Sequence, residues 1–287
     1  MENSQKPKYI FFGTPEFAAI VFKKLIQSGF PPAYLICNPD KPTGRKKTIT
    51  PPPTKIVAEE NGIPVLQPEQ LDPNDFKKLG SFDFFVIAAY SKIIKKEIIE
   101  IPRLGIIGVH PSLLPKYRGA SPIQSSILEG DKETGVTLFL IDEKVDHGLI
   151  MTSSKLKTEN LKLNYLEMQR KLAELGGQLL VQTLPKFAEG KIKSRPQDEN
   201  GATFTKKFTS EDGYITPTDL EKARSGADPA LAGLIERKIR ALNPEPGVWT
   251  IFYEKRTKLL EADLRSAKLI LKTIQAEGKK PTSPSPK

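Results

Sequence analysis

The sequence predicts an α/β protein: a doubly wound, mostly parallel sheet followed by a smaller C-terminal β-barrel module. Over the first half of the chain, short apolar runs rich in β-branched residues alternate with amphipathic stretches of helical spacing. This alternation is typical of parallel strands joined by right-handed helical crossovers. Near the C-terminus, three short β-rich runs follow one another closely, which indicates antiparallel strands.

The individual elements follow from these patterns and from Gly, Pro and Asn residues that end them. Predicted strands of the large sheet are residues 9–12, 34–37, 64–67, 82–89, 104–109 and 136–141. Predicted helices are residues 16–27, 54–61, 75–79, 93–101, 121–128 and 164–188.

The C-terminal module is expected to be short. Its predicted elements are a helix at residues 231–242 and strands at residues 249–253, 258–262 and 269–274. Residues 190–208 are basic and lack helical periodicity, which favours a linker. We therefore expect a catalytic domain at 1–193, a linker at 194–212, the second domain at 213–280 and a disordered tail at 281–287.

Composition excludes several protein classes. The 287 residues are 38% hydrophobic and 27% charged, and no apolar run approaches the roughly 20 residues that a membrane helix needs. The first residues lack the apolar core of a signal peptide. A single cysteine, Cys37, rules out an internal disulfide and fits a reducing cytoplasm. The net charge of +10 favours a polyanionic partner, although basic surfaces also serve solubility.

The most informative polar residues follow two predicted strands. His110 comes at the end of the run 104–109 and Pro111 prevents its continuation, so the imidazole is expected at the carboxyl end of a strand. Asp146 lies in the loop after the run 136–141. Open α/β sheets bind ligands at the carboxyl ends of their strands, so the two groups could converge. Taken singly, each has a plain structural alternative, a core histidine or a turn aspartate.

A loop of about 16 residues, 38–53, separates two predicted elements, and loops of this length are usually functional or disordered. It contains Lys41, Arg45, Lys46 and Lys47, and no acidic residue occurs from Lys41 to Lys55. It is either a solvated flexible lobe or an arm that contacts phosphates and becomes ordered on RNA.

Longer motifs give these residues a context. Residues 110–124 read HPSLLPKYRGASPIQ, and they are followed by ETGVT at 133–137 and DEKVDHG at 142–148. These strings closely resemble the site of the 10-formyltetrahydrofolate-dependent formyltransferases. Residues 12–18, 39–45 and 239–247 resemble, within that family, the enzymes that formylate methionyl-tRNA. The resemblance implies a Rossmann-like formyltransferase domain and an oligonucleotide-binding-like C-terminal barrel, here shortened.

The resemblance also implies roles. His110 and Asp146 match the catalytic pair, 10-formyltetrahydrofolate would be the formyl donor, and methionyl-tRNA the acceptor. No metal, no membrane association and a monomer are expected. Residues expected at the folate are Tyr90, Ser91, Ser112, Leu113, Leu114 and Pro115. Residues expected at tRNA are Lys41, Arg45, Lys46 and Lys47.

One position departs from the family pattern. Gly108 stands where the family carries an Asn that stabilises the oxyanion, and the missing side chain is expected to leave space for a water. Formyl transfer therefore has three alternatives: hydrolysis of 10-formyltetrahydrofolate, deformylation of formyl-methionine, or tRNA binding without catalysis. His147, the only other histidine, is either an exposed turn residue or a second base or metal ligand. No HExxH spacing supports a metal.

Overall fold

The computed structural model describes residues 7–44, 46–159, 161–252 and 254–284. The chain forms two compact units that are interleaved along the sequence. The first comprises Met1–Arg118, Thr134–Lys157 and Gln169–Phe204, and the second comprises Gly119–Glu133, Thr158–Met168 and Thr205–Lys287. The linear domain boundaries given above stay predictions.

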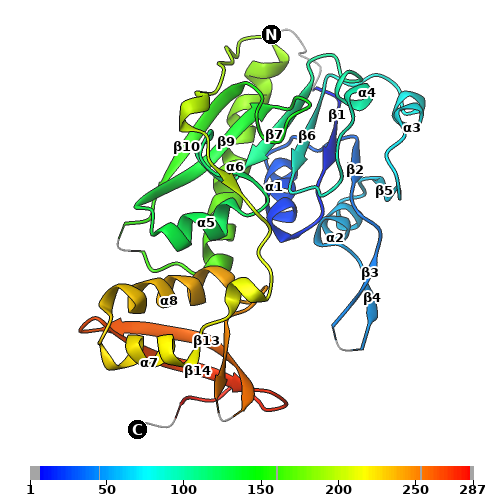
Figure 1. Ribbon diagram of the computed structural model, residues 1–287. Helices are drawn as coiled ribbons and strands as arrows, with labels where there is room; N and C mark the ends of the chain where they lie inside the picture. Colours follow the sequence, from blue (N-terminus) through cyan, green and yellow to red (C-terminus); the bar gives the residue numbers. More distant parts are fainter. Residues whose placement is uncertain (1–6, 45, 160, 253, 285–287) are drawn as a thin grey trace. The chain divides into compact units, whose positions relative to one another are not determined.

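The first unit is built on a seven-stranded sheet of order β10-β9-β7-β6-β1-β2-β5, which confirms the α/β fold (Figure 1). Its strands are β1 (Tyr9–Phe12), β2 (Tyr34–Ile36), β5 (Val65–Leu66), β6 (Phe84–Ala88), β7 (Ile106–His110), β9 (Glu133–Leu140) and β10 (Ile150–Lys157). Its helices are α1 (Glu16–Gln27), α2 (Pro53–Glu60), α3 (Pro73–Lys78), α4 (Lys96–Ile99) and most of α6 (Tyr165–Ala188). β1, β2, β5, β6 and β7 pair in parallel, whereas β9 runs antiparallel to β7.

Both faces of this sheet are covered, as the uninterrupted apolar strands predict. Successive residues of a strand point to opposite faces. Phe11 packs against Phe22 of α1, with ring centroids 5.0 Å apart. Its neighbour Phe12 lies in the cluster on the other face, which includes Phe76 of α3. Helices therefore flank the sheet on two sides.

The long loop after β2 has more structure than expected. Residues 38–53 contain an antiparallel hairpin of β3 (Lys41–Thr43) and β4 (Thr48–Thr50), with all six strand residues exposed. The side-chain oxygens of Thr43 and Thr50 lie 2.5 Å apart across it. Strand pairing satisfies the backbone groups of this exposed segment without needing a core, and both expectations for the loop, a flexible lobe or an arm that contacts RNA, stay predictions.

Two predicted elements differ in extent. The helix predicted at 93–101 shrinks to the single turn α4, because Ile93 is 88% exposed and the first fully buried side chain on this segment is Ile98. α6 has the predicted extent to within one residue. Leu166, near its start, is more than half exposed, so the buried stripe begins farther along the helix, at Met168.

The second unit combines helices with an antiparallel sheet of order β12-β13-β14. These strands are β12 (Trp249–Phe252), β13 (Lys255–Arg265) and β14 (Lys268–Ala276). The helices of this unit are α5 (Pro122–Glu129), η2 (Glu211–Gly213), α7 (Pro217–Ser225) and α8 (Pro229–Leu242). The two-residue turn Ser266–Ala267 has positive φ at both positions, the geometry that joins twisted strands. A small C-terminal β module is thus confirmed.

Three short elements remain, β8 (Arg118–Gly119), η1 (Glu199–Gly201) and β11 (Phe204–Thr205). At the C-terminal end, Thr282 exchanges two backbone hydrogen bonds with Ile274, so the start of the predicted tail is paired. Residues 285–287 lie outside the described part. No helix in the described ranges has the length and apolar character to cross a bilayer.

Candidate active site

The structure places the His110 imidazole between a backbone carbonyl and a carboxylate. His110 is the last residue of β7 and only 6% exposed. Its Nε2 lies 2.8 Å from the carbonyl oxygen of Tyr117, and its Nδ1 lies 3.5 Å from Asp146 Oδ2. A carbonyl only accepts hydrogen bonds, so Nε2 carries a proton and donates it to Tyr117. The Nδ1 edge is therefore the edge that can exchange a proton.

Asp146 reaches His110 by a route that the sequence does not predict. The expectation that both groups lie beyond carboxyl ends at one sheet edge was wrong, because β9 is antiparallel to β7. Leu140, the last residue of β9, pairs with Ile107, whereas Thr137 pairs with His110. Three residues of strand span about 10 Å, so the loop after β9 must fold back by about that length. Asp146 has φ of 48° within this loop.

The space expected beside Gly108 is filled. A Cβ built on Gly108 would lie 2.3 Å from the Phe139 ring, which is buried and stands directly opposite in the pairing of β7 with β9. The expectation that Gly108 leaves space for a water was therefore wrong. The same ring meets the His110 ring edge to face, with centroids 6.4 Å apart. Phe139 thus packs on both Gly108 and His110.

The loop after His110 is fastened to β9. The Thr137 hydroxyl donates to the carbonyl of Ser112 and accepts from the amide of Leu114, at 2.8 and 3.0 Å. Ser112 is fully buried, and its hydroxyl donates to the Lys116 carbonyl at 2.5 Å. Of the four predicted folate contacts here, Leu113 and Pro115 are the partly exposed ones. The Leu114-Pro115 peptide is cis.

Polar groups also gather after β2 and β6. Asn38 donates through Nδ2 to the Ser91 hydroxyl at 3.0 Å. The Asn38 side-chain oxygen and the Tyr90 hydroxyl are buried, and neither has a hydrogen-bond partner among the described residues. Burial raises the pKa of Tyr90 to about 12, so its hydroxyl stays protonated at neutral pH and can donate. Unsatisfied buried polar atoms at carboxyl strand ends fit a ligand with polar edges, as a pterin has.

His147 is half-buried rather than an exposed turn residue. Its Nδ1 lies 2.6 Å from Asp142 Oδ2, and its Nε2 lies 3.7 Å from Glu199 Oε1. Within the described ranges, no three His, Cys, Asp or Glu residues group closely enough to hold a metal ion.

Sequence reasoning missed two residues behind Asp146. Arg118 is 2% exposed and binds both Gln197 and Glu199. Gln197 donates to backbone carbonyls on either side of His147. Arg118 lies inside the recognised motif, but Gln197 falls in the segment predicted to be a linker, where no periodicity marks it.

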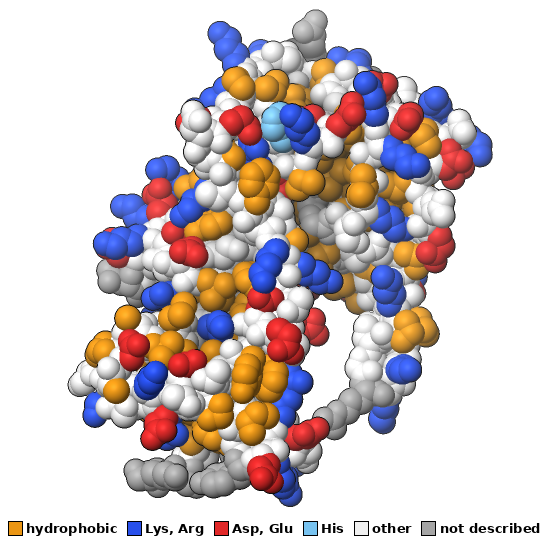
Figure 2. Space-filling model, in the orientation of Figure 1, with side chains coloured by type: hydrophobic (Ala, Val, Ile, Leu, Met, Phe, Trp, Pro, Cys, Tyr) orange, Lys and Arg blue, Asp and Glu red, His pale blue; other side chains and the backbone are white. Residues whose placement is uncertain are grey.

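The described residues among those predicted to contact tRNA lie on the hairpin. Lys41, Lys46 and Lys47 are all exposed, and Arg45 lies outside the described residues. Burial also raises the pKa of the nearby Cys37 thiol to about 11, so this thiol stays protonated and unreactive. Figure 2 shows that Lys and Arg side chains on the face drawn are interspersed with acidic ones. A continuous basic surface is not seen there.

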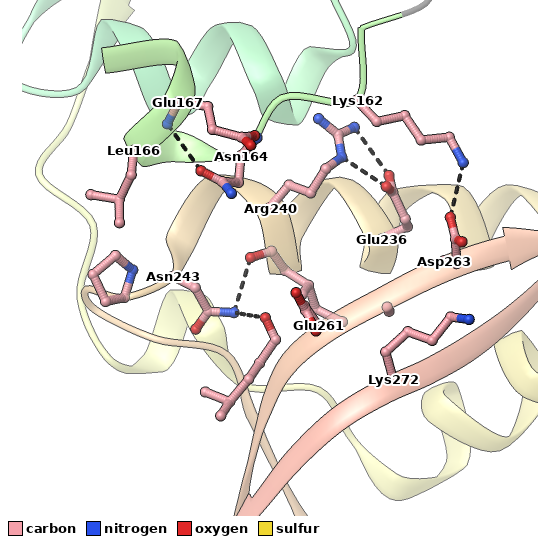
Figure 3. Close-up of a pocket in the computed structure, with 14 residues that line it drawn as sticks. Lys162, Asn164, Leu166, Glu167, Glu236, Arg240, Asn243, Glu261, Asp263 and Lys272 are labelled. Carbon is pink, nitrogen blue, oxygen red and sulfur yellow. Dashed lines mark hydrogen bonds and ion pairs between the residues drawn. The ribbon is translucent and has the colours of Figure 1, made fainter. Parts of the chain in front are cut away.

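The second unit contains a separate hollow of about 560 Å³. Charged groups around it already pair with each other, as Lys162 does with Asp263 and Arg240 with Glu236 (Figure 3). Acidic and basic groups nearly balance among its lining residues. The hollow therefore does not suit a polyanion.

Comparisons with known proteins show the family of this chain. A family described as "Formyl transferase" matches residues 7–184, and "Formyl transferase, C-terminal domain" matches residues 230–268. A methionyl-tRNA formyltransferase of Kosmotoga olearia is 40% identical over 260 residues, covering 90% of this chain and 80% of that protein. One of Halalkalibacterium halodurans is 38% identical, covering 89% and 78%.

Solved structures share the fold at lower identity. Methionyl-tRNA formyltransferase from Clostridium thermocellum superposes with a TM-score of 0.60 at 19% identity, covering 94% of this chain and 98% of that one. WlaRD, a sugar 3N-formyl transferase solved in the presence of dTDP and 5-N-formyl-THF, gives 0.63 at 18% identity, covering 92% and 88%.

Proposed function

Because this chain belongs to the methionyl-tRNA formyltransferase family, we propose that it transfers the formyl group of 10-formyltetrahydrofolate to the amino group of methionyl-tRNA. The observation that carries the proposal is the facing pair of His110 and Asp146, 3.5 Å apart. Distances of this size are common for catalytic pairs before substrate binds, and they shorten in the reacting complex.

In this reaction, a bond forms between the methionyl nitrogen and the formyl carbon, and the bond from that carbon to N10 of the folate breaks. The attacking amine must lose a proton, and N10 must gain one. With Nε2 held as a donor by Tyr117, His110 takes the amine proton at Nδ1 and returns it to N10. The positive charge of the imidazolium formed between these steps stabilises the oxyanion.

Asp146 acts through that charge. Its carboxylate faces Nδ1 and can pair with the positive charge that the ring carries during transfer. Gly108 has no side-chain amide to donate to the oxyanion, and removing one such donor typically lowers turnover about 10²–10³-fold. We therefore expect a slower enzyme than one with the amide.

The formyl donor is proposed to lie along the carboxyl ends of β2 and β6. The Tyr90 hydroxyl and the Asn38 side-chain oxygen Oδ1 offer one donor and one acceptor, which suits the polar edge of a pterin. Ser91 supports Asn38. The segment Ser112, Leu113, Leu114 and Pro115 would provide apolar contacts, mainly through its partly exposed members.

The acceptor is proposed to contact the hairpin β3–β4 through Lys41, Lys46 and Lys47, together with Arg45. Contacts from flexible lysines to phosphate position a nucleic acid without reading its bases. All the catalytic groups named come from one chain, so a monomer suffices. The cytoplasm, where reduced folate and charged tRNA occur together, is the proposed site of action.

The test is to incubate the chain with 10-formyltetrahydrofolate, with and without methionyl initiator tRNA, and to measure formyl-methionyl-tRNA and free formate separately. Formyl-methionyl-tRNA is the expected product. His110→Asn and Asp146→Asn should each lower kcat by about 10²–10⁴-fold. Asp83→Asn, which alters an exposed pair with Arg103, is the control.

Free formate without tRNA would instead support folate hydrolysis, and formate from formyl-methionyl peptides would support deformylation. Either result, or tRNA binding without any product, would overturn the proposal. The Phe139 ring occupies the space beside Gly108 that was expected to hold a water, and this argues against the hydrolytic alternatives.

A further inference from the structure

The loop that carries Asp146 is held in an arrangement that its own sequence does not favour. Asp146 has φ of 48°, in the left-handed region that is strained for most residues other than glycine and that Asp adopts only as a single residue. The loop also folds back along β7, against the direction in which β9 leaves the sheet. Such a conformation persists only where surrounding contacts over-determine it.

Gln197 supplies those contacts. Its Nε2 donates to the carbonyl oxygens of Asp146 and Gly148, both at 2.9 Å. The two carbonyls flank His147, so one side-chain amide fastens the backbone at both ends of the turn. Gln197 is 9% exposed, and its position is fixed by the pairing of Arg195 with Ile150 two residues earlier.

Arg118 fixes the orientation of that amide. Its Nε and Nη2 donate to Gln197 Oε1 at 3.1 and 2.8 Å. A guanidinium only donates and a backbone carbonyl only accepts, so the glutamine oxygen must face Arg118 and its nitrogen must face the loop. Glu199 holds Arg118 in turn, through contacts of 3.0 and 2.6 Å. All four hydrogen-bonding positions of the Gln197 amide are therefore used.

We propose that Gln197 is a positioning residue: oriented by Arg118, it holds the Asp146 backbone folded back so that the carboxylate faces His110 Nδ1. It does not touch substrate, and it acts through Asp146. This inference rests on the proposed function for its kinetic consequence, but the geometry it describes belongs to the protein without substrate.

The chemistry makes Gln197→Glu a selective probe. A carboxylate still accepts both hydrogen bonds from Arg118 but cannot donate to the carbonyls of Asp146 and Gly148. Gln197→Met, of similar volume, loses the contacts on both sides. The matched control is Gln169→Met, because Gln169 is a buried glutamine of the same unit with 8% exposure.

The kinetic arm compares these full-length variants in the formylation assay. Misplacing a catalytic group by about 1 Å costs about 10²-fold. We expect Gln197→Glu and Gln197→Met to lower kcat by about that factor, with KM for both substrates unchanged and the melting midpoint close to that of Gln169→Met. A general structural role would instead change stability without this separation of kcat from KM.

The second arm needs no activity. The chain has only two histidines, so the imidazole region of its nitrogen NMR spectrum contains signals from two rings. The variant His147→Asn removes one set and so assigns the other to His110. We expect both Gln197 variants, but not Gln169→Met, to shift the His110 nitrogen signals, because the neighbouring carboxylate moves away.

Wild-type kcat together with an unchanged His110 spectrum in Gln197→Glu would overturn the inference. Unfolding of both Gln197 variants while Gln169→Met stays folded would overturn it as well, since Gln197 would then serve general stability. A wild-type chain that forms no formyl-methionyl-tRNA would overturn the proposed function alone, and the NMR arm would still decide the positioning role.

Discussion

Gly108 and Phe139 stand directly opposite each other on paired strands, and the aromatic ring covers the glycine. Two of its atoms lie within 2.6 Å of the position where a side chain at 108 would begin. The ring also contributes to a small apolar cluster with Leu114 and Ile150. The departure at position 108 is therefore part of a packing arrangement in which a large residue on β9 compensates for a missing side chain on β7.

This arrangement predicts coupled substitutions. Gly108→Ala should lower the free energy of unfolding by about 1–3 kcal/mol, because the buried ring must move. Phe139→Ala is destabilising by itself because it empties a buried site, but the double variant should lose less stability than the sum of the two single losses. Gly108→Asn alone should not raise kcat, whereas Gly108→Asn with Phe139→Ala should, because the amide then has space. Urea unfolding and formylation kinetics of the single and double variants measure both effects.

Additive effects of Gly108→Ala and Phe139→Ala on the free energy of unfolding would show that the two positions are not packed together. A higher kcat for Gly108→Asn alone would show that the ring yields easily.

The element that differs most from expectation is the hairpin β3–β4. Its strands are held by their backbone pairing and by the threonine contact, and its side chains are exposed. At its base, Lys55 forms an ion pair with Asp40 at 2.9 Å and also donates to Gln67. Lys55 thus has a structural partner, whereas Lys41, Lys46 and Lys47 form no ion pair with the described residues.

This division predicts a separation of kinetic effects. Changing Lys41, Lys46 and Lys47 to Glu in one variant should raise KM for methionyl-tRNA by at least about tenfold, because phosphate contacts are lost and repulsion is added. The kcat and the KM for the formyl donor should stay unchanged. Replacing Lys77 and Lys78 of α3 is the control, and an equal effect there would assign the change to net charge alone.

A second element is the turn η2, where Asp212 accepts hydrogen bonds from the backbone and hydroxyl of Thr209 and from Lys206. These contacts, led by that to Lys206, lower the pKa of Asp212 from 3.8 to about 2. A lowered folded-state pKa means that the stabilisation is complete above the unfolded value of 3.8 and is lost as the pH falls towards 2.

We therefore expect Asp212→Asn to lower the free energy of unfolding at pH 7 and to have progressively less effect as the pH falls below about 4. Urea unfolding of wild type and variant across this range measures it. A difference that does not depend on pH would show that the charge of Asp212 is not what stabilises the turn.

At the scale of the whole molecule, the net charge is +10. On the face seen in Figure 2, Lys and Arg side chains are interspersed with acidic ones. The charge-balanced hollow in the second unit likewise adds no polyanion site. Electrostatic attraction to RNA should then depend on a limited number of close contacts, and on overall steering.

The corresponding prediction concerns salt. Raising KCl from about 50 to 200 mM should raise KM for methionyl-tRNA several-fold and leave KM for the formyl donor nearly unchanged, because only the tRNA contacts release many counterions. Steady-state kinetics with each substrate varied in turn provide the measurement. An equal salt effect on both substrates would contradict a binding mode based on phosphate contacts.

The sequence by itself determined the class of fold, most strand and helix positions and the family, because these depend on local periodicity, on Gly and Pro positions and on contiguous motifs. It also singled out His110 and Asp146. The structure decided how they meet, because strand direction, the left-handed turn at Asp146 and the contacts of Gln197 are non-local. Likewise, only tertiary packing puts the Phe139 ring over Gly108, since the two residues are neighbours across strands and distant along the chain.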